Sequence, residues 1–134
     1  MKRLLLAGAA ALVAVAAHAE PLGLHCSLTS TDPKDPPDTV TLQINGNGTW
    51  RDLSDSTAPG PWPMTTTSAV YHLTIPRREV AQYYFMTDTY DIDRITGSVS
   101  ALTVTEYDDG KGHDTPTMSN YSGTCVKTDL TPKF

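Results

Sequence analysis

The chain has 134 residues, of which 39% are hydrophobic, and it carries 15 Asp and Glu against 10 Lys and Arg. This length accommodates one domain with a modest core. The negative charge, with basic residues scattered along the chain, excludes the electrostatic footprint of a nucleic-acid-binding protein and argues against binding to an anionic membrane surface. Acidity favours a cationic partner, although solubility alone also explains it.

Residues 1–19 have the layout of a secretory signal peptide. The basic pair Lys2-Arg3 precedes an apolar run of 14 residues, and a small-x-small cleavage site ends at Ala19. The run is too short for a membrane-spanning helix, which needs about 20 residues. We therefore expect cleavage after residue 19, a single β domain over 20–134, and a periplasmic or secreted location in a bacterium. The mature chain keeps eight Lys and Arg against 15 Asp and Glu, a formal charge of −7.

The two cysteines, Cys26 and Cys125, lie near the two ends of the mature chain. An even pair in an exported protein predicts a disulfide, whereas a redox pair would have C-x-x-C spacing. The bond needs Cα atoms about 6 Å apart, so the first and last strands must be neighbours or face each other across the core. Such closure fits a small barrel or a two-sheet sandwich. His25 stands where a lipoprotein needs a small residue, which disfavours a lipid anchor on Cys26.

The first half of the mature chain predicts a strand and a hairpin. Residues 24–29 alternate apolar and polar, which turns one set of side chains toward the core: Leu24, Cys26 and Leu28. Residues 39–44 alternate in the same way, and 49–53 form a short return strand. The Asn45-Gly46-Asn47-Gly48 segment between them is a hairpin signal, because Asn and Gly both tolerate the positive φ that a tight turn requires.

Residues 54–68 show no periodicity and contain Pro59-Gly60-Pro61-Trp62-Pro63, so we expect a long loop. A tryptophan on a stiff, extended segment offers a large contact area at low entropic cost, which makes Trp62 a candidate partner-binding residue. The alternative, which we favour, is that Trp62 folds back as a lid over one end of the core.

Residues 70–75 alternate again and predict a strand that Pro76 ends, because proline lacks the backbone donor of a central strand. We expect one helical turn over 77–82. A long hairpin then occupies 83–107, with Gly97 at positive φ where its turn closes.

The expected register of this hairpin places Ile92 opposite Ser100 and Tyr90 opposite Leu102. One face then carries Tyr90, Ile92, Leu102 and Val104, and the other carries Thr89, Asp91, Asp93, Val99 and Thr103. A polar loop over 108–116 and a closing strand over 117–126 complete a total of seven or eight short strands. That spacing is typical of all-β sandwiches and small barrels.

The charged residues beside the hairpin turn, Asp91, Asp93 and Arg94, are a candidate partner-binding surface. Paired carboxylates also serve as acid and base in some enzymes, and Asp88 lies nearby. Asp and Arg beside a turn more commonly cap backbone donors and pair with each other, so we expect no catalytic residue here. No G-x-S-x-G or S-x-x-K motif indicates nucleophilic catalysis, and we expect no enzymatic activity.

The loop after the hairpin contains candidate metal ligands: Asp108, Asp109, His113 and Asp114. Carboxylates suit calcium, and a histidine with an aspartate suits zinc. Their spacing fits no EF-hand loop, so a solvated hairpin tip is the simpler interpretation, and we expect no cofactor. Tyrosine and methionine side chains could line a barrel mouth for a small apolar ligand, or simply fill the core.

The run Ile92-Asp93-Arg94-Ile95-Thr96-Gly97, with Gly123-Thr124-Cys125 near the end, resembles a pattern in small exported bacterial β proteins. That resemblance implies architecture rather than activity. In size and in the link between terminal cysteines, the chain is also similar to the periplasmic inhibitors of C-type lysozyme. Their Ser-Gly-x-x-Tyr loop has no clear counterpart here, so no inhibitor residue is carried over.

The sequence therefore predicts an exported, disulfide-closed, all-β barrel or sandwich with a non-enzymatic binding role. The expected partner is another protein, bound through Trp62 and the acidic face. The alternatives are a barrel that holds a small apolar ligand, and a metal-binding or hydrolytic protein that uses the 108–114 loop.

Overall fold

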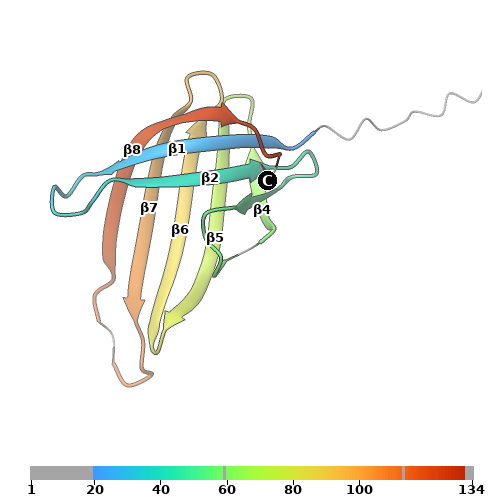
Figure 1. Cartoon of the computed structure of the whole chain (residues 1–134). Helices are drawn as coiled ribbons and strands as arrows, with labels where there is room; N and C mark the ends of the chain where they lie inside the picture. Colours follow the sequence, from blue (N-terminus) through green and yellow to red (C-terminus); the bar gives the residue numbers. More distant parts are fainter. Residues whose placement is uncertain (1–19, 59, 113, 132–134) are drawn as a thin grey trace, which may run out of the picture.

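The structure, a computed structural model, describes residues 20–58, 60–112 and 114–131, so the expected signal peptide lies outside the described residues. The described residues form an antiparallel barrel in which each strand pairs with the next along the chain and the last pairs with the first (Figure 1). The prediction of an all-β fold with seven or eight strands is confirmed, as a barrel. The strands are β1 Leu22–Ser30, β2 Asp38–Ile44, β3 Thr49–Asp52, β4 Trp62–Thr66, β5 Val70–Ala81, β6 Tyr84–Asp93, β7 Ser98–Tyr107 and β8 Thr117–Thr128.

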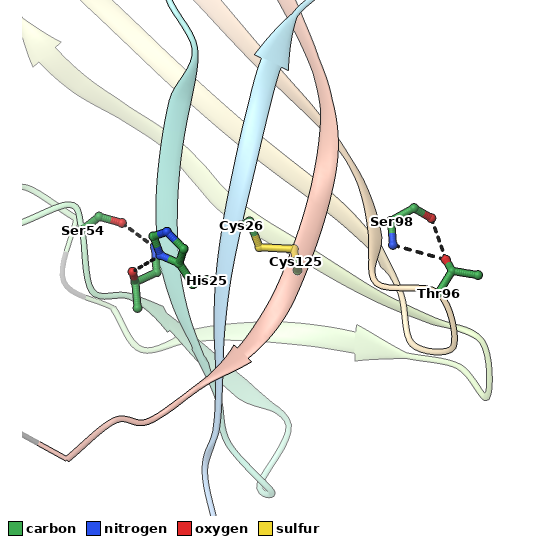
Figure 2. Close-up of a disulfide and its surroundings, with 7 residues drawn as sticks. His25, Cys26, Ser54, Thr96, Ser98 and Cys125 are labelled. Atoms are coloured by element: carbon green, nitrogen blue, oxygen red, sulfur yellow. Dashed lines mark hydrogen bonds between the residues drawn. A yellow bond between two sulfur atoms is a disulfide. The ribbon is translucent and has the colours of Figure 1, made fainter.

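A disulfide joins the strands that close the barrel. Cys26 of β1 lies directly opposite Cys125 of β8, and their sulfurs are 2.04 Å apart (Figure 2). This confirms the predicted link. The two strands approach closely at Gly123, where a Cβ atom would lie 1.8 Å from the backbone oxygen of Ser27. Only glycine fits there, so the closing seam depends on the residue type as well as on the bond.

The barrel interior follows the alternation of the strands. Leu24, Cys26 and Leu28 point inward as predicted, with exposed fractions of 7%, 0% and 3%. A continuous apolar core fills most of the interior, and its largest fully buried side chains are Trp50, Leu42, Leu73, Ile75 and Ile92. Each side chain of this size contributes about 1.5–3 kcal/mol when it leaves water. Among the described residues, no helix is long and apolar enough to cross a membrane.

The expected register of the β6–β7 hairpin is wrong by one residue. Ile92 lies opposite Val99 and Tyr90 opposite Ala101, because the Gly97 amide bonds the Asp93 carbonyl oxygen and closes a shorter turn. Gly97 has the predicted positive φ, 76°. A shift of one residue exchanges the two faces of a strand. Inward positions of β7 are therefore Val99, Ala101 and Thr103, while Leu102 and Val104 face outward.

The expectation that Pro76 ends a strand is also wrong. β5 continues to Ala81, and the predicted helical turn over 77–82 is extended strand as far as that residue. The pairing with β6 shifts between Ile75 and Arg78, which is an irregularity of the kind that accommodates proline inside a sheet. At the turn after β2, the residue with positive φ between Asn45 and Gly48 is Gly48, at 78°.

The barrel has one short wall and one long wall. β2, β3 and β4 have 7, 4 and 5 residues, whereas β5 to β8 have 12, 10, 10 and 12. Figure 1 shows β5, β6 and β7 running far past the level of β1 and β2. β4 itself lies inside the segment expected to be an irregular loop. The long wall therefore projects as an open sheet beyond one end of the barrel.

Candidate functional site

The two ends of the barrel differ in their turns and charges. At one end lie the turns 45–48 and 94–97, and we call it the turn end. At the other, from which the long wall projects, a cavity of about 500 Å³ opens between the walls; we call it the acidic end. Charged and hydroxyl side chains line much of this cavity: Asp38, Asp52, Ser54, Asp55, Arg78, Asp88, Tyr90, Thr103, Thr105, Ser119 and Tyr121.

An ion pair between β5 and β6 forms one wall of the cavity. Arg78 Nη2 lies 2.7 Å from Asp88 Oδ2, with side chains 18% and 10% exposed. The second carboxylate oxygen of Asp88 accepts a hydrogen bond of 2.6 Å from the Thr103 hydroxyl. Both Asp88 oxygens are therefore occupied. Arg78 Nη2 also lies 3.5 Å from Asp55 Oδ2, while Arg78 Nε is buried without a hydrogen-bond partner among the described residues.

Two further polar groups belong to positions that face the core. Asp52 is 6% exposed, and its Oδ1 accepts hydrogen bonds from the Ser54 amide and hydroxyl, at 2.9 and 2.7 Å. Tyr90 is 8% exposed and packs edge-on against Trp50, with ring centroids 5.9 Å apart. Within the described part of the chain, no group hydrogen-bonds to the Tyr90 hydroxyl or to Asp52 Oδ2. Both residues line the cavity and keep hydrogen-bonding capacity there.

Negative charge dominates this end. Four carboxylates, those of Asp38, Asp52, Asp55 and Asp88, line the cavity against the single guanidinium of Arg78. Burial raises the pKa of Tyr90, and the charges of Asp52, Asp88 and Asp38 raise it further, so the hydroxyl keeps its proton. The hydrogen bond from Thr57 lowers the pKa of Asp55 despite its partial burial.

A second hollow, of about 410 Å³, lies at the turn end. Two of its charged residues, Asp93 and Arg94, hold the local turns. Asp93 Oδ1 accepts hydrogen bonds of 2.8 Å from the Ile95 and Thr96 amides, and these bonds lower the Asp93 pKa. Arg94 donates a bond of 2.6 Å to the Thr67 carbonyl oxygen. No charged side chain among its described lining residues is buried, unlike Asp52 and Asp88 at the acidic end.

No family model, curated protein or solved structure matches this chain. The candidate site therefore rests on the geometry of the chain itself.

The residues predicted to bind a partner do not form one site. Asp91 pairs with His72 on the outer face of the barrel, where both side chains are about half exposed. Asp93 caps its turn, and the guanidinium of Arg94 lies 4.8 Å from the centre of the Tyr71 ring. Trp62 begins β4, packs against the core, and has a buried indole nitrogen without a hydrogen-bond partner among the described residues. A binding role for these four residues stays a prediction.

The candidate metal ligands do not converge within the described residues. Asp108 lies 3.2 Å from Arg77 and accepts a bond from the Gly110 amide, and Asp109 accepts one from the Lys111 amide. His113 lies outside the described residues. Among the residues that are described, including Asp114, no three His, Cys, Asp or Glu side chains form a group that could hold a metal ion.

Sequence reasoning missed most of the residues at the acidic end, although strand alternation indicates that two of them point inward. Asp52 follows the inward Trp50 by two positions, and Asp88 precedes the inward Tyr90 by two. In a strand of period two, both carboxylates must point inward. Arg78 was hidden by the expected helical turn, and Thr103 by the wrong register.

Proposed function

We propose that this chain is an exported, non-enzymatic binding protein whose acidic end binds a cationic group, an ammonium or guanidinium, of its ligand. The observation that carries the proposal is the excess of carboxylates around the cavity. Four aspartates face one arginine, and two of the four, Asp52 and Asp88, are more than nine-tenths buried. Poorly hydrated carboxylates interact strongly with a cation, because little water screens them.

The open hydrogen-bonding positions support a cationic donor. Arg78 and Thr103 already occupy Asp88, and the buried groups with an acceptor still open include Asp52 Oδ2 and the Tyr90 hydroxyl oxygen. A ligand ammonium or guanidinium supplies several donors at once, and charge-assisted hydrogen bonds are about twice as strong as neutral ones. The cavity volume of about 500 Å³ lies within the range of small-molecule sites.

The polarity of the walls disfavours the alternative of a small apolar ligand. Such a ligand would cover Asp52 Oδ2 without satisfying it, and a buried unsatisfied polar group costs about 1–3 kcal/mol. A lysine or arginine side chain of another protein and a free organic cation share the favoured chemistry. We favour the protein partner and place it in the periplasm or outside the cell, in keeping with the disulfide and the signal-like residues 1–19.

Titration with three small probes tests the proposal. The oxidised mature protein, residues 20–134, is titrated with n-butylguanidinium, n-butylammonium and the neutral n-butylurea, and amide chemical shifts are followed by NMR. We expect both cations to shift amides around Asp52, Asp88 and Thr103, and n-butylurea to leave them unchanged. Equal effects of cation and neutral probe, or no effect of any probe, would overturn the proposal.

Conservative variants locate the site. Asp52→Asn keeps the oxygen that caps Ser54 but removes the charge, and Tyr90→Phe removes only the hydroxyl. We expect each to weaken cation binding, Asp52→Asn by about tenfold. Asp129→Asn is the matched control, because Asp129 is exposed beyond the end of β8 and the substitution changes the net charge equally. Equal weakening in Asp52→Asn and Asp129→Asn would indicate a general charge effect and no site at the acidic end.

A further inference from the structure

The long wall extends the acidic end with an open sheet. β1 reaches only to Tyr121 in its pairing with β8, so the earlier part of β8 pairs with β7 alone. The parts of the long wall beyond that level are here called the sheet extension, and they comprise residues 76–81, 84–87, 104–107 and 117–120. In Figure 1 they form the curved lower half of the molecule.

The inner face of the extension continues the cavity wall. The β6–β7 pairing runs without a shift from Tyr84–Tyr107 to Ile92–Val99, so Tyr84 and Met86 share a face with Asp88. Met86 and its partner Thr105 line the cavity. One step further out, the rings of Tyr84 and Tyr107 pack edge to face with centroids 5.1 Å apart, and Tyr84 is 47% exposed. An aromatic surface thus lies next to the charged one.

Tyr83, at the tip of the extension, enlarges this aromatic surface. Its ring packs against Tyr107 with centroids 6.2 Å apart and is 43% exposed. Its backbone has φ 65°, a conformation that favours glycine or asparagine and disfavours a bulky residue. Unfavourable backbone conformations held by the surrounding fold occur often at functional sites. The chain keeps an exposed aromatic ring where backbone geometry favours a small residue.

We propose that the three tyrosines Tyr83, Tyr84 and Tyr107 form a second subsite, which binds an apolar side chain of an extended peptide whose Lys or Arg occupies the cavity. The inference rests on the proposed function and names its ligand as a cationic segment of a partner protein. Tyr84 and Asp88 are four residues apart on one strand, about 13 Å. In an extended peptide, residues i and i+4 span the same distance and point to the same side.

The charge of the cavity and the continuity of its wall both favour a cationic peptide with an apolar side chain as the ligand. The cavity attracts the cation, and its wall leads through Met86 to the tyrosines without an intervening charge on β6. An aromatic or aliphatic side chain packed on the three rings would remove apolar surface from water. A free small cation reaches only the cavity, so a gain from the second side chain distinguishes a peptide from a small molecule.

Four peptides test the second subsite by calorimetry with the oxidised mature protein. They are acetyl-Arg-Gly-Ser-Gly-Phe-amide, its reversed sequence, a version with Ala in place of Phe, and a version with Phe next to Arg. We expect the better of the two spaced Phe peptides to bind about fivefold more tightly than the Ala peptide and the adjacent-Phe peptide. Equal affinity of all four would overturn the second subsite, and the n-butylguanidinium titration would still decide the proposed function independently.

Two variants test whether the tighter binding of the Phe peptide depends on the inner face of the sheet extension. Tyr84→Ser should abolish the difference between Phe and Ala peptides while leaving n-butylguanidinium binding unchanged. Met118→Ser is the matched control, because Met118 is 63% exposed on the same extension and faces outward on β8, in the opposite phase to Ser119 and Tyr121, which line the cavity. A gain that survives in Tyr84→Ser, or that is lost in Met118→Ser as well, would contradict an inner-face subsite.

Discussion

The turn end and the acidic end of the barrel use charged side chains in opposite ways. At the turn end, Asp93 caps two amides and Arg94 bonds a backbone oxygen, so these charges serve the turns. At the acidic end, Asp52 and Asp88 point into the barrel, where four carboxylates meet one guanidinium. The comparison shows that the direction of a carboxylate, more than its presence, separates a structural role from a candidate binding role.

Side-chain size explains the space inside the barrel at the acidic end. β7 contributes Ala101 and Thr103 to the acidic end, both smaller than the Leu102 and Val104 that face outward. The apolar core beside them is filled by Trp50, Leu42 and Leu73. Small inward residues on the long wall, opposite a short wall, leave the space that the charged groups line.

The largest expected effect concerns the disulfide that closes the barrel. Replacing both Cys26 and Cys125 by Ala frees a loop with a sequence separation of 99 residues. We expect the free energy of unfolding to fall by about 4–5 kcal/mol, by the chain-entropy model. Urea denaturation of the oxidised protein and the double variant measures this. Because β1 and β8 still pair along eight positions, the folded variant should bind n-butylguanidinium as before. A loss below about 1 kcal/mol would mean that strand pairing alone closes the barrel.

The next largest effect distinguishes the contributions of two adjacent arginines, Arg78 and Arg77, to stability. Arg78→Gln leaves the Asp88 carboxylate buried with only Thr103 as a partner, and we expect a loss of about 3 kcal/mol. Arg77→Gln is the control. Arg77 is 45% exposed and pairs with Glu106 and Asp108 on the outer face, where water and salt screen the charges, so we expect a much smaller loss of stability.

A double-mutant cycle completes this test. Asp88→Asn in the Arg78→Gln background removes the unpaired charge and should restore part of the lost stability. Similar losses for Arg77→Gln and Arg78→Gln in thermal or urea unfolding would refute the assignment of the buried pair.

The sequence was sufficient for the fold class, because alternation, turn residues and cysteine placement all depend on local rules. Leu24, Cys26 and Leu28 point inward as their spacing predicts, and the cysteines pair. Register and strand length were not predictable in the same way. The position of Val99 depends on one hydrogen bond across the turn, and the continuation of β5 past Pro76 depends on an irregularity in pairing with β6.

Sequence reasoning missed the candidate site because it assigned roles to charged residues from their distance to a turn in the sequence. Asp91 and Asp88 are three positions apart, yet one pairs with His72 outside and the other with Arg78 inside. Strand phase alone distinguishes the two aspartates, since Asp88 shares the phase of Tyr90 and Ile92 and Asp91 does not. Trp62 packs against the core, in keeping with the favoured expectation that it folds back onto it, but nothing in its proline-rich surroundings indicates that it begins a strand.

A pH titration sharpens the contrast between the two ends through Asp55. Its pKa is lowered in the folded protein from the ordinary value of 3.8, chiefly by the Thr57 hydroxyl. The stability it contributes is therefore present above the unfolded pKa and is lost as pH falls through the folded pKa. We expect Asp55→Asn to reduce stability by about 0.5–1 kcal/mol near neutral pH and by nothing measurable near pH 2.

Cation binding should also weaken as pH falls, since protonated carboxylates no longer attract the ligand. Affinity for n-butylguanidinium should fall as the pH is lowered from about 7 to about 2, because Asp55, whose pKa is lowered from 3.8, loses its charge in that range, and affinity should also fall with added salt. A constant affinity across this range, measured by calorimetry, would count against binding through carboxylates.

The last expected effect concerns the backbone of Tyr83 at the tip of the sheet extension. Its positive φ penalises any residue with a Cβ by about 1–2 kcal/mol, and glycine avoids that penalty. Tyr83→Gly and Tyr83→Ala both lose the contact with the Tyr107 ring, so their difference isolates the backbone term. We expect the Gly variant to be the more stable by about 1 kcal/mol. The neighbouring Gln82 lacks positive φ, so the order should reverse there, with Gln82→Ala more stable than Gln82→Gly. The same order at both positions in urea unfolding would show that the tip does not hold Tyr83 in an unfavourable conformation, and would remove one of the two observations behind the aromatic subsite.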